Sequence, residues 1–252
     1  DRRSAVVDKG DYQVYFNNET GKLTYEIANA NGNSWSKAAG EDTNGSWSLD
    51  GNPTIESSTR IGTDLFVGLG NGTGDAEVWK WNGTKWTKIG GDGVNSSWPD
   101  LTYETVPSLV NDGTNIYAGL GAGTGDAEVW KWDGTEATDL EGAPAAGSCP
   151  VLFAEKLFCI ADKETVRWSN SFAPEDWEDV NVWAFDRGDG DELSGLFVYN
   201  GGRELLACKK RSIYRLVGTD ISNFRANRAE NRYGVAGPRA GVVVDPYFYY
   251  IS

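Results

Sequence analysis

A 51-residue repeat is the feature of this chain that most restricts its possible folds. Residues 64–84 (DLFVGLGNGTGDAEVWKWNGT) recur as residues 115–135 (NIYAGLGAGTGDAEVWKWDGT), with 15 of 21 positions identical. A more diverged copy at residues 23–47 keeps tryptophans at the same offset of 51 residues. Repetition at this length indicates a chain built from copies of one supersecondary unit.

Each repeat is predicted to contain four short strands. In the second strict copy they fall at residues 105–110, 115–120, 128–132 and 138–140, separated by turns rich in Gly, Asn and Asp. A content of 32 Gly, 11 Trp, 11 Tyr and 9 Phe favours such aromatic strands and tight turns over helices. Four strands in about 50 residues is the size of a propeller blade. We therefore predict an all-β fold, a β-propeller of four-stranded blades.

The repeat also suggests how the chain is divided. Residues 1–140 carry the near-identical repeats, and residues 141–252 keep the hairpin pattern as diverged blades. We predict one propeller domain over residues 1–252, because an all-β domain of this length is common. The hairpins of the second part, at residues 151–161, 196–217 and 240–251, bring the count to five blades and a half. The sixth blade then lacks its outer strands; alternatively, five blades close and the last hairpin is an added strand pair.

The composition excludes several classes of function. Lys plus Arg is 23 and Asp plus Glu is 37, a net charge of −14 that disfavours general binding to nucleic-acid phosphates. The absence of histidine removes the usual base, the Ser-His and Cys-His nucleophile pairs, and His metal sites. Cys149, Cys159 and Cys208 lack metal-ligand spacing and are expected to be reduced and buried. We expect no catalytic residue, cofactor or metal.

Two further compositional features concern the membrane and the chain itself. No apolar run approaches the roughly 18 residues of a membrane span, so membrane insertion is not expected. The chain contains no methionine and ends in an apolar run, which we interpret as a processed or partial chain.

The glycine-rich and acidic parts of the repeat are interpreted as turns. Residues 68–74 do not match a dinucleotide-binding Gly-x-Gly-x-x-Gly motif and are followed by a strand, so we predict a strand connection. Asp75 and Asp126, with the glutamates two positions later, lack the ligand series of a calcium loop. We assign no metal ligand there. The Asn82-Gly83-Thr84 triplet is likewise predicted to be a turn rather than a glycan acceptor.

Four repeated tryptophans are candidates for sugar binding. Trp79 and Trp81, and their repeats Trp130 and Trp132, alternate along strands and should point to one face. Indoles can stack on sugar rings beside the loops of Asp75 and Asp126, but they also fill the space between blades. We favour packing, and burial of both indoles in each pair would remove the proposed platform.

Charge is unevenly placed in the second half of the chain. Residues 174–192 hold eight acids and one base, whereas residues 200–239 hold nine bases and three acids. These segments either neutralise each other within one molecule or form a head-to-tail contact between subunits that closes into a ring. For such an interface we select three bases and three acids: Lys209, Lys210, Arg211, Asp189, Asp191 and Glu192.

Residues 165–252 contain a series of short motifs in a specific order. They are VRWSN, APEDW, the GDGDE run of residues 188–192, GLFVYNGGRELLACKKRSIYRLVGTD, Asn223-Phe224 and YGVAGPRAGVVV. In this order they resemble the β-propeller portion of bacteriophage tail and neck structural proteins, including nozzle-type proteins of short-tailed phages. The resemblance implies a virion component that forms a homo-oligomeric ring around the DNA channel, touching other virion proteins and, transiently, DNA.

Three functions follow from these observations. The first is a non-enzymatic structural component of a phage tail or neck, located in the virion and assembled through propeller edges and charged loops. The alternative is a lectin-like propeller that binds a cell-surface glycan or receptor through its Trp-bearing blades, since the GTGDAEVWKW repeats resemble blades of bacterial and phage surface proteins. A third, a propeller glycosidase or sialidase, needs converging carboxylates that no spacing selects here.

Overall fold

The structure is a computed structural model of the chain. It describes residues 4–8, 13–17, 24–28, 35–39, 43–47, 54–70, 76–98, 103–121, 127–144, 148–230 and 232–252. The described chain contains β-strands and two short 3-10 helices, η1 (Thr43–Gly45) and η2 (Val94–Ser96).

The strands follow one another with short connections. They are β1 (Ser4–Asp8), β2 (Gln13–Asn17), β3 (Thr24–Ala28), β4 (Trp35–Ala39), β5 (Thr54–Ile61), β6 (Asp64–Gly70), β7 (Glu77–Trp81), β8 (Trp86–Gly90), β9 (Thr105–Asn111), β10 (Ile116–Gly121), β11 (Ala127–Trp132), β12 (Ala137–Asp139), β13 (Ser148–Phe153), β14 (Lys156–Ile160), β15 (Thr165–Trp168), β16 (Val182–Ala184), β17 (Leu193–Tyr199), β18 (Glu204–Lys209), β19 (Ile213–Val217), β20 (Arg225–Glu230), β21 (Gly241–Val244) and β22 (Tyr247–Tyr250).

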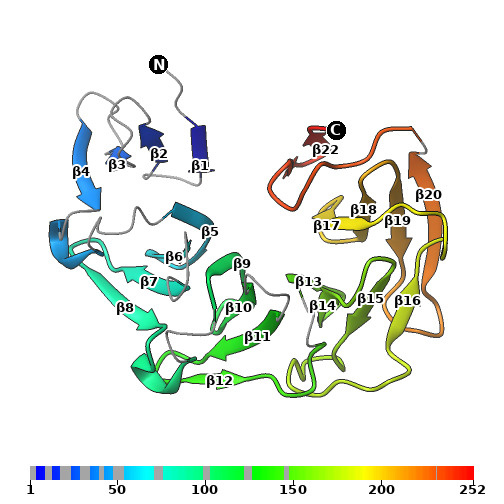
Figure 1. Ribbon diagram of the computed structural model, residues 1–252, viewed down its shortest axis with the longest axis horizontal. Coiled ribbons are helices and arrows are strands. Elements are labelled where there is room, and N and C mark those ends of the chain that lie inside the picture. Colours follow the sequence, from blue (N-terminus) through cyan, green and yellow to red (C-terminus); the bar gives the residue numbers. More distant parts are fainter. Residues whose placement is uncertain are drawn as a thin grey trace. The chain divides into compact units, whose positions relative to one another are not determined.

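The strands are grouped mostly in antiparallel fours, each in chain order. β1–β4, β13–β16 and β17–β20 are four-stranded sheets, and β21–β22 is a two-stranded sheet (Figure 1). β5–β8 and β9–β12 form one eight-stranded sheet, in which β6 and β9 meet through the single pair Gly70 and Thr105. The predicted all-β fold of four-stranded blades with an incomplete last one is confirmed for the described residues. The strands predicted for the third blade are also confirmed, with β9, β10, β11 and β12 within two residues of the expected bounds.

The chain divides into two compact units. One comprises residues 1–116, 120–124 and 132–138, and the other comprises residues 117–119, 125–131 and 139–252. Each unit is described by itself below. The prediction of a single domain over residues 1–252 stays a prediction.

Side-chain amides and carboxylates fix the tight turns of the first unit. The Asn82 Oδ1 accepts hydrogen bonds from the backbone N–H groups of Thr84 and Lys85, each at 3.0 Å. Asp133, one repeat later, accepts equivalent bonds from the N–H groups of Thr135 and Glu136 at 2.8 and 3.0 Å. These Asx turns explain why Asn-Gly and Asp-Gly recur at this place, and they confirm the predicted turn at Asn82.

The core of the first unit is built on tryptophans of the repeat. Trp47 lies edge-on to Trp86, with ring centroids 5.1 Å apart, and Trp81 lies 5.4 Å from Trp86. Trp79 packs against the same cluster from a partly exposed position. The predicted common face of Trp79 and Trp81 is therefore confirmed. Burial of each large apolar side chain contributes roughly 1.5–3 kcal/mol.

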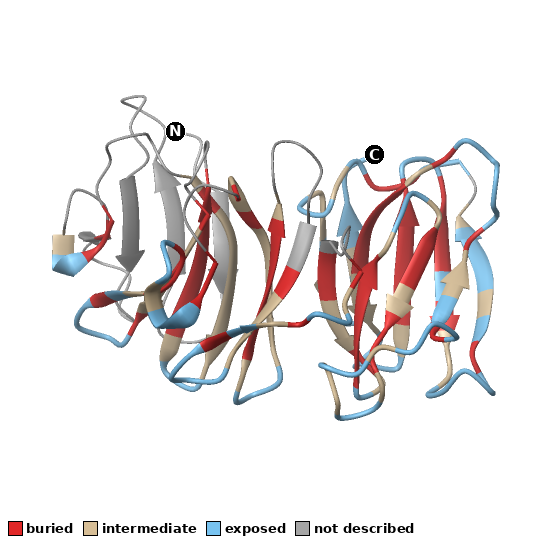
Figure 2. Ribbon diagram, turned by 60° about the horizontal axis from the view of Figure 1, so that its bottom comes forward, coloured by how far each residue is buried: buried red, intermediate tan, exposed pale blue. Residues whose placement is uncertain are grey.

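The core of the second unit joins the fourth blade (β13–β16) to the fifth (β17–β20). Trp168 stands opposite Phe158 in the β14–β15 register, and their rings stack at 5.2 Å. Phe224, which leads into β20, closes on Trp168 edge-on at 5.2 Å. Buried positions follow the strands of this unit, and exposed positions concentrate in its loops and terminal hairpin (Figure 2). Sheet-on-sheet packing is thus the source of its stability.

A close backbone contact explains one glycine of the YGVAG motif. A Cβ on Gly234 would lie 2.0 Å from the carbonyl oxygen of Lys209 and 2.4 Å from the amide nitrogen of Arg211. The next residue, Val235, donates its N–H to the same Lys209 carbonyl at 2.9 Å. Residues 234–235 are therefore packed directly on the β18–β19 turn.

We expect Gly234→Ala to lower the free energy of unfolding by about 2 kcal/mol, because the added methyl must displace backbone. Gly237→Ala is the matched control, since a Cβ there meets no atom within 4 Å, and its effect should stay within about 0.5 kcal/mol. Urea unfolding of the two variants measures both values. Equal effects would show that the contact at Gly234 is not tight.

Candidate functional site

The densest polar site of the second unit lies between two loops. One is the β16–β17 loop, residues 185–192, whose Gly188 and Gly190 adopt φ values of 77° and 71°. The other is the β18–β19 turn, which closes with a hydrogen bond from the Lys209 N–H to the Ser212 carbonyl at 2.8 Å. The left-handed glycines let the acidic loop fold back, so that its carboxylates face the basic turn.

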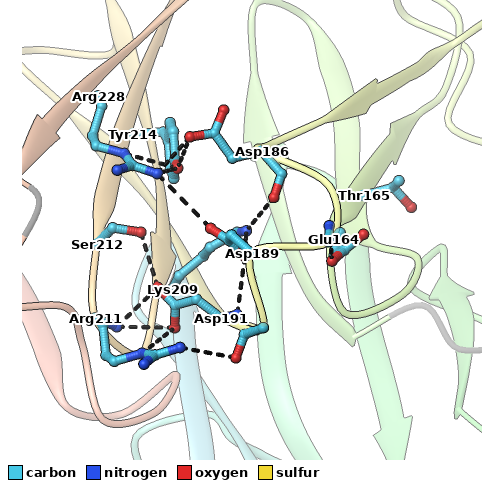
Figure 3. A network of polar contacts seen from close by, with 12 residues as sticks. Glu164, Thr165, Asp186, Asp189, Asp191, Lys209, Arg211, Ser212, Tyr214 and Arg228 are labelled. Atoms are coloured by element: carbon cyan, nitrogen blue, oxygen red, sulfur yellow. Dashed lines mark hydrogen bonds and ion pairs between the residues drawn. The ribbon is translucent and has the colours of Figure 1, made fainter.

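All six residues predicted for a subunit interface come together in this place, within one chain. They form three ion pairs with each other: Lys209 with Asp189 at 2.8 Å, Lys210 with Glu192 at 2.9 Å, and Arg211 with Asp191 at 3.8 Å (Figure 3). We call this set of six the charged lock. The alternative that the two segments neutralise each other within one molecule thus describes these residues, and their contact with a second subunit stays a prediction.

Lys209 is the buried member of the lock. Its side chain has no exposed surface, and its Nζ donates to the Asp189 carboxylate at 2.8 Å and to the Asp186 carbonyl at 3.2 Å. The ammonium also lies 5.8 Å from the ring centroid of Tyr214. The hydrogen bond from Lys209 holds the pKa of Asp189 below its usual value. A buried ammonium needs such a set of acceptors, because desolvating an unpaired charge is costly.

Asp191 satisfies the backbone of the basic turn. Its carboxylate accepts the Arg211 N–H at 3.1 Å and the Ser212 hydroxyl at 2.9 Å. The side chain is only 6% exposed. The Arg211 guanidinium in turn donates to the Gly190 carbonyl at 3.0 Å. The GDGDE run and the KKRS turn therefore specify each other's conformation.

Glu192 connects the lock to the fourth blade. Its carboxylate pairs with Lys163 of the β14–β15 turn at 2.6 Å as well as with Lys210. The hydrogen bonds from Lys163 and Lys210 lower the pKa of Glu192 from 4.5 to about 2. The Gly188 N–H also donates to the Glu164 carboxylate at 2.7 Å. The acidic loop thus ties the turns of two neighbouring blades together.

The structure adds a cluster that the sequence interpretation missed. Tyr214 of β19 stands opposite Arg228 of β20 in the sheet register, and its hydroxyl donates to the Asp186 carboxylate at 2.8 Å. The Arg228 guanidinium donates to that hydroxyl at 2.9 Å and also pairs with Asp186. Cross-strand pairing of β19 and β20 is the signal that could have found it, since paired residues share a face.

The lock predicts a specific loss of stability in acid. The pKa of Glu192 is depressed on folding, so its contribution is complete above pH 4.5 and disappears as the pH falls through about 2. We expect Glu192→Gln to unfold at a lower temperature than the wild type at pH 7. The two melting temperatures should converge towards pH 2, as circular dichroism across this range would show. A constant difference at every pH would contradict the assigned role of Glu192.

The tryptophans predicted for glycan binding differ in exposure. Trp81 is buried, whereas Trp79, Trp130 and Trp132 are partly buried. The Trp79 N–H donates to the Glu77 carboxylate at 2.6 Å, and Glu77 also pairs with Lys88 at 2.6 Å. Trp132 packs against Phe66 at 5.7 Å. Asp75 and Asp126, the acids placed beside these indoles, lie outside the described residues.

Other candidate chemistry was searched for in the described part of the chain. No group of three or more His, Cys, Asp or Glu side chains that could hold a metal ion occurs among the described residues. The three cysteines are buried and form no disulfide, as expected. Burial raises the pKa of the Cys159 and Cys208 thiols, so neither is activated as a thiolate nucleophile. No described helix has the length and apolar character needed to cross a membrane.

Comparisons with known proteins give the class of the fold. No protein-family model matches the chain, and no curated protein matches it. Its structure is similar to the β-propeller domain of Cps50 (Swd1) from Myceliophteria thermophila, with a TM-score of 0.57 and 13% identity over 90% of this chain and 73% of that one. It is also similar to the extracellular domain of a candidate one-component system from B. thetaiotaomicron, with a TM-score of 0.53 and 10% identity. That match covers 92% of this chain and 28% of the other, so this chain spans less than a third of its length.

These similarities and the four-stranded antiparallel sheets define the protein as an all-β propeller. Identities of 13% and 10% carry information on the fold alone. The resemblance of residues 165–252 to phage tail and neck proteins therefore stays a prediction.

Proposed function

We propose that this protein is a non-enzymatic structural component of a phage tail or neck, which assembles as a ring around the DNA channel. The observation that carries the proposal is the charged lock. The motifs of residues 165–252 that resemble phage propellers are the residues that tie the fourth and fifth blades together. Charges used in this way serve rigidity, which a channel component needs more than a reactive pocket.

The charge of the chain is consistent with a DNA channel. A net charge of −14 repels phosphates, so DNA would slide past such a surface instead of adhering to it. The roles of other virion proteins and of DNA follow from this location and are part of the proposal.

Native mass spectrometry of the protein from its natural source, together with analysis of purified particles, tests the proposal. We expect a cyclic homo-oligomer and the presence of the chain in DNA-filled particles. A monomer that is missing from the particles would contradict it. The measurement reports assembly and location directly, without assuming which residues form the contacts.

Glycan binding by the repeated blades is a second candidate, because Trp79 and Trp130 keep part of their surface exposed. Its platform is smaller than the sequence predicted, since Trp81 belongs to the core. Binding to an array of cell-surface glycans tests it, with Trp79→Ala and Trp130→Ala as the variants. Loss of binding in both, with retention in Trp81→Phe, would support stacking on the exposed pair. Binding to no glycan would remove this candidate.

A further inference from the structure

Phe172 occupies a turn position that favours glycine. Residues 170–173 form a β-turn, closed by a hydrogen bond from the Ala173 N–H to the Asn170 carbonyl at 3.2 Å. Phe172 is the third residue of this turn and has a φ of 56°. A left-handed conformation is unfavourable for a bulky aromatic residue. Its side chain is nevertheless 78% exposed, so burial of the ring does not compensate for the strain.

A buried lysine holds the turn in place. Lys156 is 5% exposed, and its Nζ donates to the Ser171 hydroxyl at 2.6 Å and to the Thr219 carbonyl at 2.8 Å. The Phe172 N–H donates to the Glu155 carbonyl at 2.8 Å. These bonds join the β13–β14 turn, the turn of residues 170–173 and the β19–β20 turn at one end of the unit.

The exposed groups at this end form a protruding apolar patch with an acidic border. Ile221 of the β19–β20 turn is 44% exposed beside Phe172 of the neighbouring turn. Glu155 and Asp220 are exposed on the same two connections. Ala154 and Glu155 also have positive φ values, 48° and 64°. Strained residues that stay strained are typical of functional contacts. We call Phe172, Ile221, Glu155 and Asp220 the aromatic tip.

A flat apolar patch lies on the terminal hairpin of the same unit. In the β21–β22 register Val242 stands opposite Tyr249, and Val244 stands opposite Tyr247, so the four side chains share one face. They are 55–62% exposed. The other face of the hairpin is already used, because Phe248 packs on Phe197 of β17 at 4.9 Å. We call Val242, Val244, Tyr247 and Tyr249 the hairpin face.

Cations border the hairpin. The Gly201 N–H donates to the Asp245 carboxylate at 3.0 Å, which brings the β17–β18 turn and its exposed Arg203 beside the hairpin turn. Exposed Arg239 precedes β21 by two residues at the other end. The aromatic tip thus has carboxylates at its border and the hairpin face has guanidinium groups at its border. The two patches are complementary in shape and in charge.

We propose that the aromatic tip of one subunit docks on the hairpin face of a second copy of this chain. Phe172 and Ile221 would lie against the valines and tyrosines, with Glu155 and Asp220 near the arginines. A contact between two different patches is heterologous and closes into a ring when the rotation permits. This inference rests on the proposed ring and names the contact that forms it.

Photo-cross-linking of the full-length chain tests the contact. A benzophenone amino acid at position 172 is irradiated in a mixture of isotopically labelled and unlabelled protein, and the products are mapped by mass spectrometry. We expect cross-links between labelled and unlabelled chains, ending in residues 242–249. Cross-links that join position 172 to another region, or to its own chain, would overturn the docking.

Phe172→Gly separates binding from folding. Glycine relieves the left-handed backbone, so the variant should be at least as stable as the wild type, while its association weakens by about thirtyfold, as for loss of a hot-spot side chain. Val180→Ser is the matched control, because Val180 is 61% exposed on the same β15–β16 connection but outside the aromatic tip. Sedimentation of the three proteins over a concentration series measures association. A ring in which Phe172→Gly assembles normally would overturn the docking and leave the proposed function intact. A wild-type protein that is monomeric at every concentration would instead overturn the ring itself.

Discussion

Asp189→Ala is expected to destabilise the protein more than Lys209→Met, although both changes break the same ion pair. Removal of Asp189 leaves the Lys209 ammonium, which has no exposed surface, with the Asp186 carbonyl as its remaining acceptor. An uncompensated buried charge of this kind costs roughly 3–5 kcal/mol. In Lys209→Met the Asp189 carboxylate is still 26% exposed and still accepts the Asp191 N–H. Methionine also refills the apolar volume of the stem. The second variant should therefore lose only about 1–2 kcal/mol.

Urea unfolding of both variants and of Lys210→Met gives the comparison. Lys210 is the neighbouring residue and is also paired with a carboxylate, but its side chain is 57% exposed, so its loss should cost less than about 1 kcal/mol. The double variant Asp189→Ala/Lys209→Met should be less destabilised than the sum of the two single variants, because it leaves no buried charge. If Lys209→Met proved as costly as Asp189→Ala, the asymmetry of burial would not control the energetics of the lock.

The strands and turns of this protein could be predicted because their signals are local. Asn82 and Asp133 hydrogen-bond to the backbone two and three residues later, so the sequence of one turn is enough to recognise it. The alternation of Trp79 and Trp81 likewise reports a common face without knowledge of any other strand. Repetition then multiplied these signals and made the blade recognisable.

The pairing of the charged segments could not be predicted, because it depends on where two distant loops end. Counting residues 174–192 and 200–239 revealed opposite charges but not their direction. The β17–β18 register, in which Leu193 pairs with Lys209, places the acidic loop and the basic turn at the same end of the fifth blade. Once this register is known, Asp189 and Lys209 must be neighbours. The strain at Phe172 was hidden for a similar reason, since the letters of a turn do not reveal which position takes the left-handed conformation.

Trp168→Ala is expected to cost about 3–5 kcal/mol, the range for removal of a large aromatic side chain from a core. Trp168 has no exposed surface and contacts the rings of Phe158 and Phe224, which come from β14 and from the entry to β20. Its loss therefore opens the packing between the fourth and fifth blades rather than one local pocket. Because Lys163 and Glu192 join the same blades at their rim, a cavity at Trp168 should also weaken the charged lock.

Trp168→Phe distinguishes this role from a general intolerance of substitution. Phenylalanine keeps an aromatic ring against Phe158 and removes an indole N–H for which the structure offers no protein acceptor, so the cost should stay below about 2 kcal/mol. Urea unfolding at pH 7 provides both free energies, and the pH dependence of Trp168→Ala tests the link to the lock. A smaller acid-induced loss of stability than in the wild type would show that core packing and the Lys163–Glu192 pair are coupled. An unchanged pH dependence would show that the aromatic core and the charged rim stabilise the two blades independently.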